Sequence, residues 1–165
     1  MGASIRLVER DDSDALRAIY NLEVRESTVT FDMVERSPEE QLVWIDEHRG
    51  AYAAIVAVDE PTGAVVGFGS LSPYRPRAAY SPTVEDSVYV HRRPRGQGHG
   101  RLLLEELVRR ARVHGFHTVI ARIVGGHEAS IALHAGCGFA PVGTEREVGR
   151  KFNRWLDVSV LQRML

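Results

Sequence analysis

The chain has 165 residues, of which 44% are hydrophobic and 26% are charged, and these fractions are ordinary for one soluble globular domain. Its formal net charge of −1 excludes a global attraction to nucleic acid or to an anionic membrane, so any anion site must be local. No apolar run approaches the ~20 residues that span a bilayer, and the N-terminus lacks the apolar core of a signal peptide. Cys137 is the single cysteine, so no internal disulfide can form. We therefore expect one cytoplasmic domain over residues 1–165.

The first half of the chain predicts one strand, two helices and a hairpin. Residues 4–14 begin as a short strand with Ile5 and Leu7 on one face. A helix follows, with apolar residues at helical spacing: Leu16, Ile19, Tyr20 and Val24. The next helix starts at a capping box made by Ser37 and Glu40 and stops near Gly50. Residues 52–58 and 64–71 are β-rich runs joined by "DEPTG", which indicates a hairpin.

The second half predicts strands that alternate with helices and then a closing pair of strands. After a proline-broken loop, the strand 84–90 places Val84, Asp86, Val88 and Val90 on one face and Glu85, Ser87 and Tyr89 on the other. The following helix carries an apolar stripe of Leu103, Leu104, Leu107, Val108 and Ala111 and ends at Gly115. A strand at 117–124, a short helix within 125–139 and strands at 140–149 and 154–165 complete the chain. This order favours an α/β protein with a mixed, mostly antiparallel sheet flanked by helices.

The segment "HRRPRGQGHG", residues 91–100, joins the strand 84–90 to the helix that follows it. Helix N-termini present unpaired backbone N–H groups, and glycines allow phosphate oxygens to approach them closely. We expect Arg92, Arg93, Arg95 and Arg101 to add local positive charge, and the alternative is a glycine-rich turn with solvated arginines. The loop lacks the third glycine of a dinucleotide fingerprint and the G-K-[ST] of a nucleotide-triphosphate loop, which leaves a pyrophosphate loop of another kind.

The sequence R-G-Q-G-H-G, residues 95–100, fits the [R/Q]-x-x-G-x-[G/A] motif of the GNAT superfamily of acyl-CoA N-acyltransferases. Six ordered segments resemble the phosphinothricin N-acetyltransferase family, whose acceptors include methionine sulfoximine and methionine sulfone: "STVTFD", "SLSPYRPRAAY", "TVEDSVYV", "EASIALH", "GFAPVGTEREVG" and "KFNRWLDV". The resemblance implies a GNAT fold and direct attack of an amino acid analogue's α-amine on acetyl-CoA. It also implies a homodimer with acceptor pockets near the subunit interface.

The resemblance implies that acetyl-CoA is bound mainly by the chain between the strand 84–90 and the short helix near residue 130. The main chain of the strand contacts the pantetheine arm, the glycine loop contacts the pyrophosphate, and two later residues complete the site. The residues implied are Val88, Tyr89, Val90, Arg95, Gly96, Gln97, Gly98, His99, Gly100, Arg101, His127 and Ser130.

For the chemistry, the resemblance implies Glu85 as the general base and a catalytic role for His134. The alternatives are an exposed strand glutamate and a packed or proton-relaying helix histidine. Arg75 and Arg77 lie in the proline-broken loop, and a guanidinium fork matches a carboxylate or phosphinate. Either arginine is alternatively a solvated loop residue. We expect Phe31 to pack on the acceptor side chain.

Three departures from the family concern the site. His127 replaces an asparagine that contacts the cofactor, Gly136 with Cys137 should loosen the end of the short helix, and Arg150 replaces a common aromatic near the acceptor. The seven histidines are scattered and predict no metal site. Two other functions stay open: an acetyltransferase for another amine such as a protein N-terminus, and a CoA-binding module without turnover.

Overall fold

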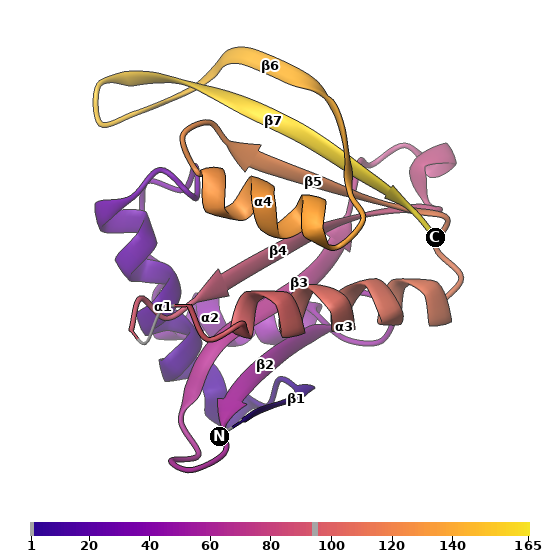
Figure 1. Cartoon of the computed structure of the whole chain (residues 1–165). Coiled ribbons are helices and arrows are strands. Elements are labelled where there is room, and N and C mark those ends of the chain that lie inside the picture. The colour runs from indigo at the N-terminus through magenta and orange to yellow at the C-terminus, as the bar shows by residue number, and fades with distance from the viewer. Residues whose placement is uncertain (1, 94–95) are drawn as a thin grey trace.

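The structure, a computed structural model, describes residues 2–93 and 96–165. Its helices and strands follow the predicted order, and two short 3-10 turns, Arg10–Asp12 (η1) and Ala78–Tyr80 (η2), are added. The strands are β1 Ala3–Leu7, β2 Ala54–Asp59, β3 Val65–Pro73, β4 Thr83–Val90, β5 Thr118–Val124, β6 Ala140–Lys151 and β7 Arg154–Met164. The helices are α1 Ser13–Glu26, α2 Pro38–Glu47, α3 His99–Val113 and α4 Glu128–Gly136 (Figure 1).

The strands form one seven-stranded sheet in the order β1-β2-β3-β4-β5-β7-β6. Every neighbouring pair is antiparallel except β4 and β5, which are parallel. The prediction of a mixed, mostly antiparallel sheet is therefore confirmed. The hairpin of β6 and β7 closes one edge, and Figure 1 shows it extending beyond the body of the sheet.

Two apolar cores lie on opposite faces of the sheet. The larger core joins the apolar stripe of α3, with Leu103, Leu104 and Leu107 fully buried, to the facing residues of β2 to β5 and to α4. The smaller core packs α1 and α2 on the other face, around Phe68 of β3. Because Val84 belongs to the first core and Tyr89 packs against the second, the predicted alternation of β4 is confirmed.

The sequence pattern predicts the start of α2 correctly but predicts the burial of β1 only in part. The Ser37 hydroxyl accepts from the Glu40 N–H at 3.1 Å, and the Glu40 carboxylate accepts from the Ser37 N–H at 2.8 Å, which confirms the capping box. In β1 the expected apolar face is less buried than its sequence predicts, because Leu7 is 51% exposed at the end of an edge strand.

The parallel pairing of β4 and β5 covers three residues on each strand and ends at Glu85 and Ile120. Beyond that point the two strands fan apart, as Figure 1 shows. The remaining half of β4 keeps β3 on one side, and no strand of the described residues pairs with its other side. The sheet therefore contains a wedge-shaped split at the carboxyl ends of its two parallel strands.

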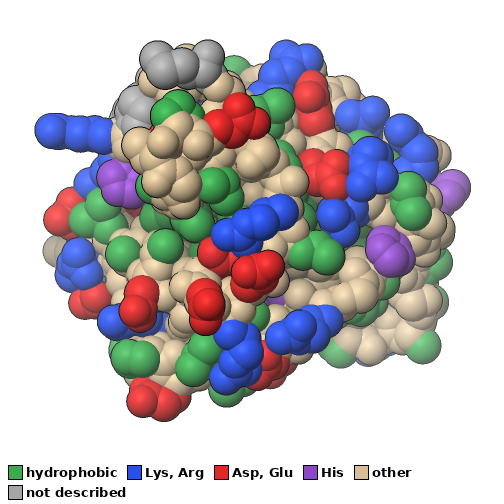
Figure 2. All heavy atoms as spheres, turned by 90° about the horizontal axis from the view of Figure 1, so that it is seen from below, with side chains coloured by type: hydrophobic (Ala, Val, Ile, Leu, Met, Phe, Trp, Pro, Cys, Tyr) green, Lys and Arg blue, Asp and Glu red, His purple; other side chains and the backbone are tan. Residues whose placement is uncertain are grey.

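The surface agrees with the near-zero net charge. On the face in Figure 2, acidic and basic side chains are interspersed. Within residues 2–93 and 96–165, no helix combines the length and the apolar character that crossing a bilayer demands.

Candidate active site

A cavity of about 800 Å³ occupies the split between β4 and β5. Residues from Asp86 to Val90 line one wall, and residues from Ala121 to Val124 line the other. The first turns of α3 and α4 also border the cavity, so two helix N-termini share one space. This arrangement gathers unpaired backbone N–H groups and the positive ends of two helix dipoles around a single ligand site.

The backbone of β4 turns alternate residues toward this cavity. The His91 N–H donates to the Val66 carbonyl at 2.8 Å, which fixes the phase of the antiparallel ladder between β3 and β4. Tyr89 therefore bonds β3 through its backbone, whereas Val88 and Val90 direct their N–H and C=O groups into the split. Of the three predicted strand residues, two offer main-chain groups to a ligand, and the Tyr89 ring packs against Tyr20 and Phe68.

The three glycines of the loop have two different physical roles. Gly96 and Gly98 have φ of +74° and +78°, backbone angles that residues with a side chain rarely adopt. No atom lies within 4 Å of the position that a Cβ would occupy at either glycine. Gly98 is also the N-cap of α3. Gly100 instead permits packing, because a Cβ there would lie 3.2 Å from Leu133 of α4. Arg95, which the motif includes, lies outside the described residues.

The remaining loop residues lie around the mouth of the cavity. Gln97 and Arg101 line it, and His99, the first residue of α3, also lines it with a side chain that is mostly buried. In the first turn of α3, the N–H of Leu102 bonds the Gly98 carbonyl, which leaves the earlier N–H groups directed outward. Backbone groups are therefore the main feature that the loop offers to an anion.

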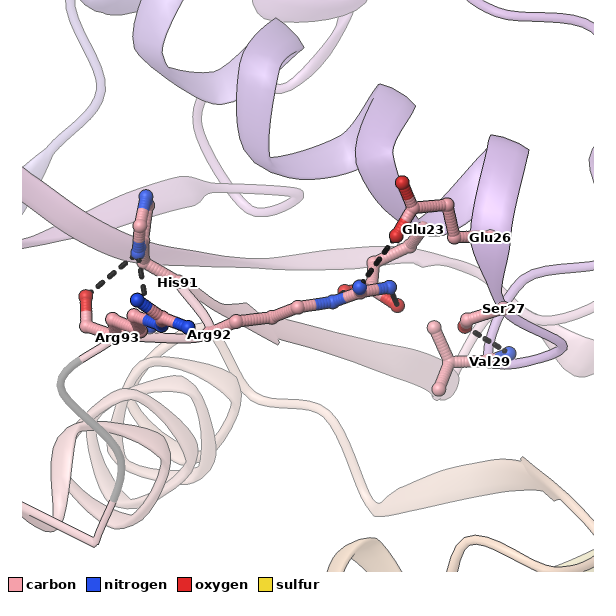
Figure 3. Close-up of polar contacts among 7 residues, drawn as sticks. All are labelled: Glu23, Glu26, Ser27, Val29, His91, Arg92 and Arg93. Carbon is pink, nitrogen blue, oxygen red and sulfur yellow. Dashed lines mark hydrogen bonds and ion pairs between the residues drawn. The ribbon is translucent and has the colours of Figure 1, made fainter.

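The positive charge expected around the loop is partly balanced by carboxylates. Arg92 forms ion pairs with Glu23 at 2.9 Å and with Glu26 at 2.7 Å, both on α1, as Figure 3 shows. Arg101 pairs with Glu105 one turn along α3. The local positive charge expected from Arg92 and Arg101 is therefore balanced by neighbouring carboxylates, and Arg92 mainly ties the end of β4 to α1.

The N-terminus of α4 supplies His127 and Ser130 to the cavity wall. His127 Nε2 lies 2.8 Å from the Thr28 hydroxyl, so the loop after α1 is tied to α4. Burial lowers the pKa of His127, which favours the neutral ring. The Ser130 carbonyl accepts from Nδ1 of His134 at 2.8 Å, so the main chain of Ser130 is engaged within the helix.

His134 forms a buried pair with Asp86 at the deep end of the split. Its Nε2 lies 2.8 Å from Asp86 Oδ2, and the two side chains are 5% and 1% exposed. Burial alone would lower the pKa of His134, but the hydrogen bond and the charge of Asp86 outweigh it and raise the pKa. Since the Ser130 carbonyl can only accept, both ring nitrogens face acceptors and the pair holds one shared proton. Asp86 Oδ1 has no hydrogen-bond partner among the described residues.

Glu85 lies one residue away and points to the opposite face of the sheet. Its side chain is 30% exposed, and its Oε1 lies 3.8 Å from Nε of Arg122 on β5. Burial raises the pKa of Glu85, and the Arg122 guanidinium opposes this shift. Glu85 is thus a carboxylate with no close hydrogen bond from a described residue, and it can accept a proton from a ligand.

Arg75, one of three further predicted residues, is close enough to Glu85 to favour its charged form. Arg75 and Arg77 are exposed, and Arg75 stacks on Tyr74 with 4.9 Å between the guanidinium carbon and the ring centre. The Phe31 ring lies against Gly149 of β6 so closely that a Cβ there would collide with it. Phe31 therefore packs on the closing hairpin and keeps 40% of its surface exposed.

Arg150, the expected departure near the acceptor, is engaged at the tip of the hairpin. It bonds Asn153 and lies over Trp155, 4.8 Å from the ring centre. The guanidinium of Arg150 therefore contacts residues of the hairpin turn itself. Across the described parts of the chain, no three His, Cys, Asp or Glu side chains are grouped to hold a metal ion.

Sequence reasoning missed the partners of the predicted residues. The sequence did indicate that Asp86 has a buried partner. A charged residue on the same strand face as Val84, Val88 and Val90 would be buried and would need one. For Arg122 and Thr28 no local signal exists, since their partners are remote in sequence.

A parallel strand pair that splits around a cavity, with a glycine loop and a helix N-terminus beside it, is the arrangement that the resemblance to the acyl-CoA N-acyltransferases implies. The profile described as an acetyltransferase (GNAT) domain matches residues 5–160. Phosphinothricin N-acetyltransferase of Streptomyces coelicolor is 41% identical over 157 residues, which are 94% of this chain and 92% of the relative. L-methionine sulfoximine/L-methionine sulfone acetyltransferase of Pseudomonas paraeruginosa is 39% identical over 98% of this chain and 94% of its own.

A solved structure agrees with these sequence relatives. The GNAT superfamily phosphinothricin acetyltransferase of Sinorhizobium meliloti, determined in complex with acetyl-CoA, has a TM-score of 0.95 and 38% identity. The match covers 100% of this chain and 89% of that one. The chain therefore belongs to the GNAT family of acetyl-CoA-dependent N-acetyltransferases, as its glycine loop and ordered segments predicted.

Proposed function

We propose that this enzyme transfers an acetyl group from acetyl-CoA to the α-amino group of a small amino acid analogue of the phosphinothricin or methionine sulfone type. One observation carries the proposal: where the split begins, Glu85 and the Asp86–His134 pair lie on opposite faces of β4. An amine and a thioester that meet at this point would each have ionisable groups beside them.

The described residues fit acetyl-CoA. The open space beside Gly96 and Gly98, together with the first N–H groups of α3, suits the pyrophosphate. The free main-chain groups of Val88 and Val90 suit the amides of the pantetheine arm. The unpartnered Asp86 Oδ1 would gain a donor from a ligand or from water at the deep end of the split.

The acceptor binds on the Glu85 side of the sheet. Arg75 and Arg77 supply guanidinium groups for a carboxylate and for the oxidised head group of the analogue. Phe31 supplies an apolar edge, and its contact with Gly149 fixes the position of its ring. We propose these roles because Arg75 is close enough to favour the charged form of Glu85, and because guanidinium groups and an aromatic ring suit the chemistry of such an acceptor.

The reaction begins with the transfer of a proton from the acceptor ammonium to Glu85. The freed nitrogen lone pair forms the new C–N bond at the thioester carbonyl. As the C–S bond breaks, the sulfur leaves with its electron pair as the CoA thiolate. The nitrogen gives up its second proton, which passes to this sulfur, so the products are the N-acetyl amide and the free CoA thiol. His134 does not remove the first proton in this scheme, because both of its nitrogens already face acceptors. Its shared proton with Asp86 instead offsets negative charge at the sulfur end.

The enzyme also carries a surface that suits a second copy of the chain. Large apolar side chains are exposed along the β6–β7 hairpin, and their exposed fractions reach 50–60%: Val142, Val148, Phe152 and Trp155. Such exposure is typical of an interaction surface. We propose that the whole chain forms one catalytic domain, that it acts as a homodimer in the cytoplasm, and that this hairpin contributes to the interface.

The test is thiol release from acetyl-CoA with a panel of amines. Phosphinothricin and methionine sulfone should be acetylated with a kcat/KM well above that of ordinary amino acids or of a peptide with a free N-terminus. Faster turnover of the peptide would replace the proposed acceptor class. Tight binding of acetyl-CoA without release of thiol for any amine would show a binding module.

A further inference from the structure

Arg122 is a charged residue of the split that the reaction described above does not use. It lies on β5, and its side chain, 30% exposed, reaches across the same face of the sheet as Glu85. Its Nη2 forms an ion pair with Glu145 of β6 at 2.5 Å, while its Nε lies 3.8 Å from Glu85 Oε1. One guanidinium thus stands between two carboxylates that come from different strands.

We propose that Arg122, held in place by Glu145, is a positioning residue that keeps Glu85 ionised and therefore able to accept the proton of the acceptor amine. This inference rests on the proposed function, since it assigns a role to the neighbour of the proposed base. Arg122 acts through Glu85 and needs no contact with the reacting atoms.

The geometry supports a charge effect more than a hydrogen bond. A separation of 3.8 Å between Nε and Oε1 is too long for a good hydrogen bond but short enough for strong attraction in a half-buried place. The closer ion pair with Glu145 restrains the guanidinium by charge attraction, since an arginine side chain is otherwise long and mobile. The carboxylate oxygens of Glu85 therefore stay available to the acceptor, while the positive charge of Arg122 stabilises their negative charge.

The charged groups that act on Glu85 lie on its own strand, on β5, on β6 and in the loop before β4. Arg122 on β5 and Arg75 in the loop before β4 favour its charged form, whereas Asp86 on β4 and Glu145 on β6 oppose it. Burial also opposes it and is the largest influence, so the pKa of Glu85 is raised above its ordinary value. A fixed cation nearby opposes this effect and favours the ionised form that a base requires.

The first measurement follows the Glu85 carboxyl carbon by NMR during a pH titration of labelled protein, and it needs no turnover. Arg122→Gln should raise the pKa of Glu85 by about one unit, the low end of the effect of an opposite charge at this range. Arg122→Lys, which keeps the charge, should stay close to the wild type. In a Glu145→Gln background the same Arg122→Gln change should raise the pKa of Glu85 by less, because a guanidinium that Glu145 no longer holds acts less strongly on Glu85.

The second measurement is the pH profile of kcat/KM with methionine sulfone. In Arg122→Gln the lower inflection should move upward with the NMR value, and activity should recover toward the wild type on the alkaline side. A merely structural role would lower the whole profile without moving the inflection. An unchanged Glu85 titration in folded Arg122→Gln, or an equal shift in Arg122→Lys, would overturn the inference. If the wild type turns over no amine, the proposed function fails, yet the NMR titration still decides whether Arg122 controls Glu85.

Discussion

The two sides of the split differ in whether backbone groups or side chains form them. The cofactor side consists of backbone: two glycines with positive φ, the first N–H groups of α3, and the free edge of β4 at Val88 and Val90. The proposed acceptor side consists of charged side chains, with Glu85, Arg122 and Glu145 contributed by three strands. A backbone site follows from a continuous stretch of chain, whereas a side-chain site depends on how distant segments meet.

This difference implies different sensitivities to mutation. On the cofactor side, a side-chain truncation should matter little, and an added side chain should matter greatly. On the acceptor side, the loss of one charge should change specificity or pH dependence while the binding of acetyl-CoA stays the same.

The largest expected effect is at the proposed base. Glu85→Gln should lower kcat/KM by about 10²–10⁴, the usual range for loss of a general base. Raising the pH should recover part of that loss, because more acceptor then arrives as free amine. His134→Ala should show a smaller loss without the same rescue, since its ring nitrogens are engaged by Asp86 and Ser130.

The measurement for this pair is kcat/KM between about pH 6 and pH 10 with one acceptor for both variants. Near-normal activity in Glu85→Gln, combined with a severe and pH-rescued defect in His134→Ala, would make His134 the base.

The next largest effect is at the glycine loop. Gly98→Val should weaken the binding of acetyl-CoA by about a hundredfold or more, because a β-branched residue resists a φ of +78° and fills the open space beside α3. Calorimetric titration measures the affinity. Gly63→Val is a matched control, since Gly63 has a φ of +71° in the β2–β3 turn and equally open surroundings. Unchanged affinity in folded Gly98→Val would contradict the anion site at this loop.

A moderate effect is expected at the exposed arginine of the acceptor side. Arg75→Ala should raise the KM for the amino acid acceptor by roughly tenfold, the scale of one charge-assisted contact, and should leave the KM for acetyl-CoA nearly unchanged. Arg112→Ala, an exposed arginine on α3, serves as the control for the loss of a surface charge. If neither KM of Arg75→Ala moves, this residue does not hold the acceptor carboxylate.

The smallest effect concerns stability and comes from the Asp86–His134 pair. The folded pKa of His134 is raised, so the pair's contribution is complete below the ordinary histidine pKa and is lost as the pH rises through the folded value. Asp86→Asn should therefore cost about 1 kcal/mol more at pH ~5.5 than at pH ~9. Urea unfolding at both pH values measures the difference. An equal cost at the two pH values would mean that folding changes no proton affinity at this pair.

The same difference explains which features of the fold and the site could be predicted from the sequence. The element order, the capping box of α2 and the two faces of β4 follow from local patterns, and all three are confirmed. The glycine loop was predictable for the same reason, since Gly96 and Gly98 adopt their conformations within a few residues of chain.

The charges of the site were less predictable. Arg92 looked like part of an anion site, but α1 presents Glu23 and Glu26 to it from 69 and 66 residues away in the chain. The sequence analysis assigned no role to Arg122, because its partners lie on β4 and β6, far away in the chain. Composition gives the number of charges, whereas tertiary structure decides which of them are balanced.

Backbone binding of acetyl-CoA is tested most directly by amide hydrogen exchange along β4, measured by NMR with and without acetyl-CoA. The N–H groups of Val88 and Val90 face the split, whereas the neighbouring N–H of Tyr89 is directed to β3 by the ladder phase that His91 and Val66 fix. Acetyl-CoA should therefore slow exchange at Val88 and Val90, by about tenfold or more if the bonds form, and should change Tyr89 little. Equal protection of all three amides, or none at Val88 and Val90 under saturating acetyl-CoA, would contradict a cofactor held by the free edge of this strand.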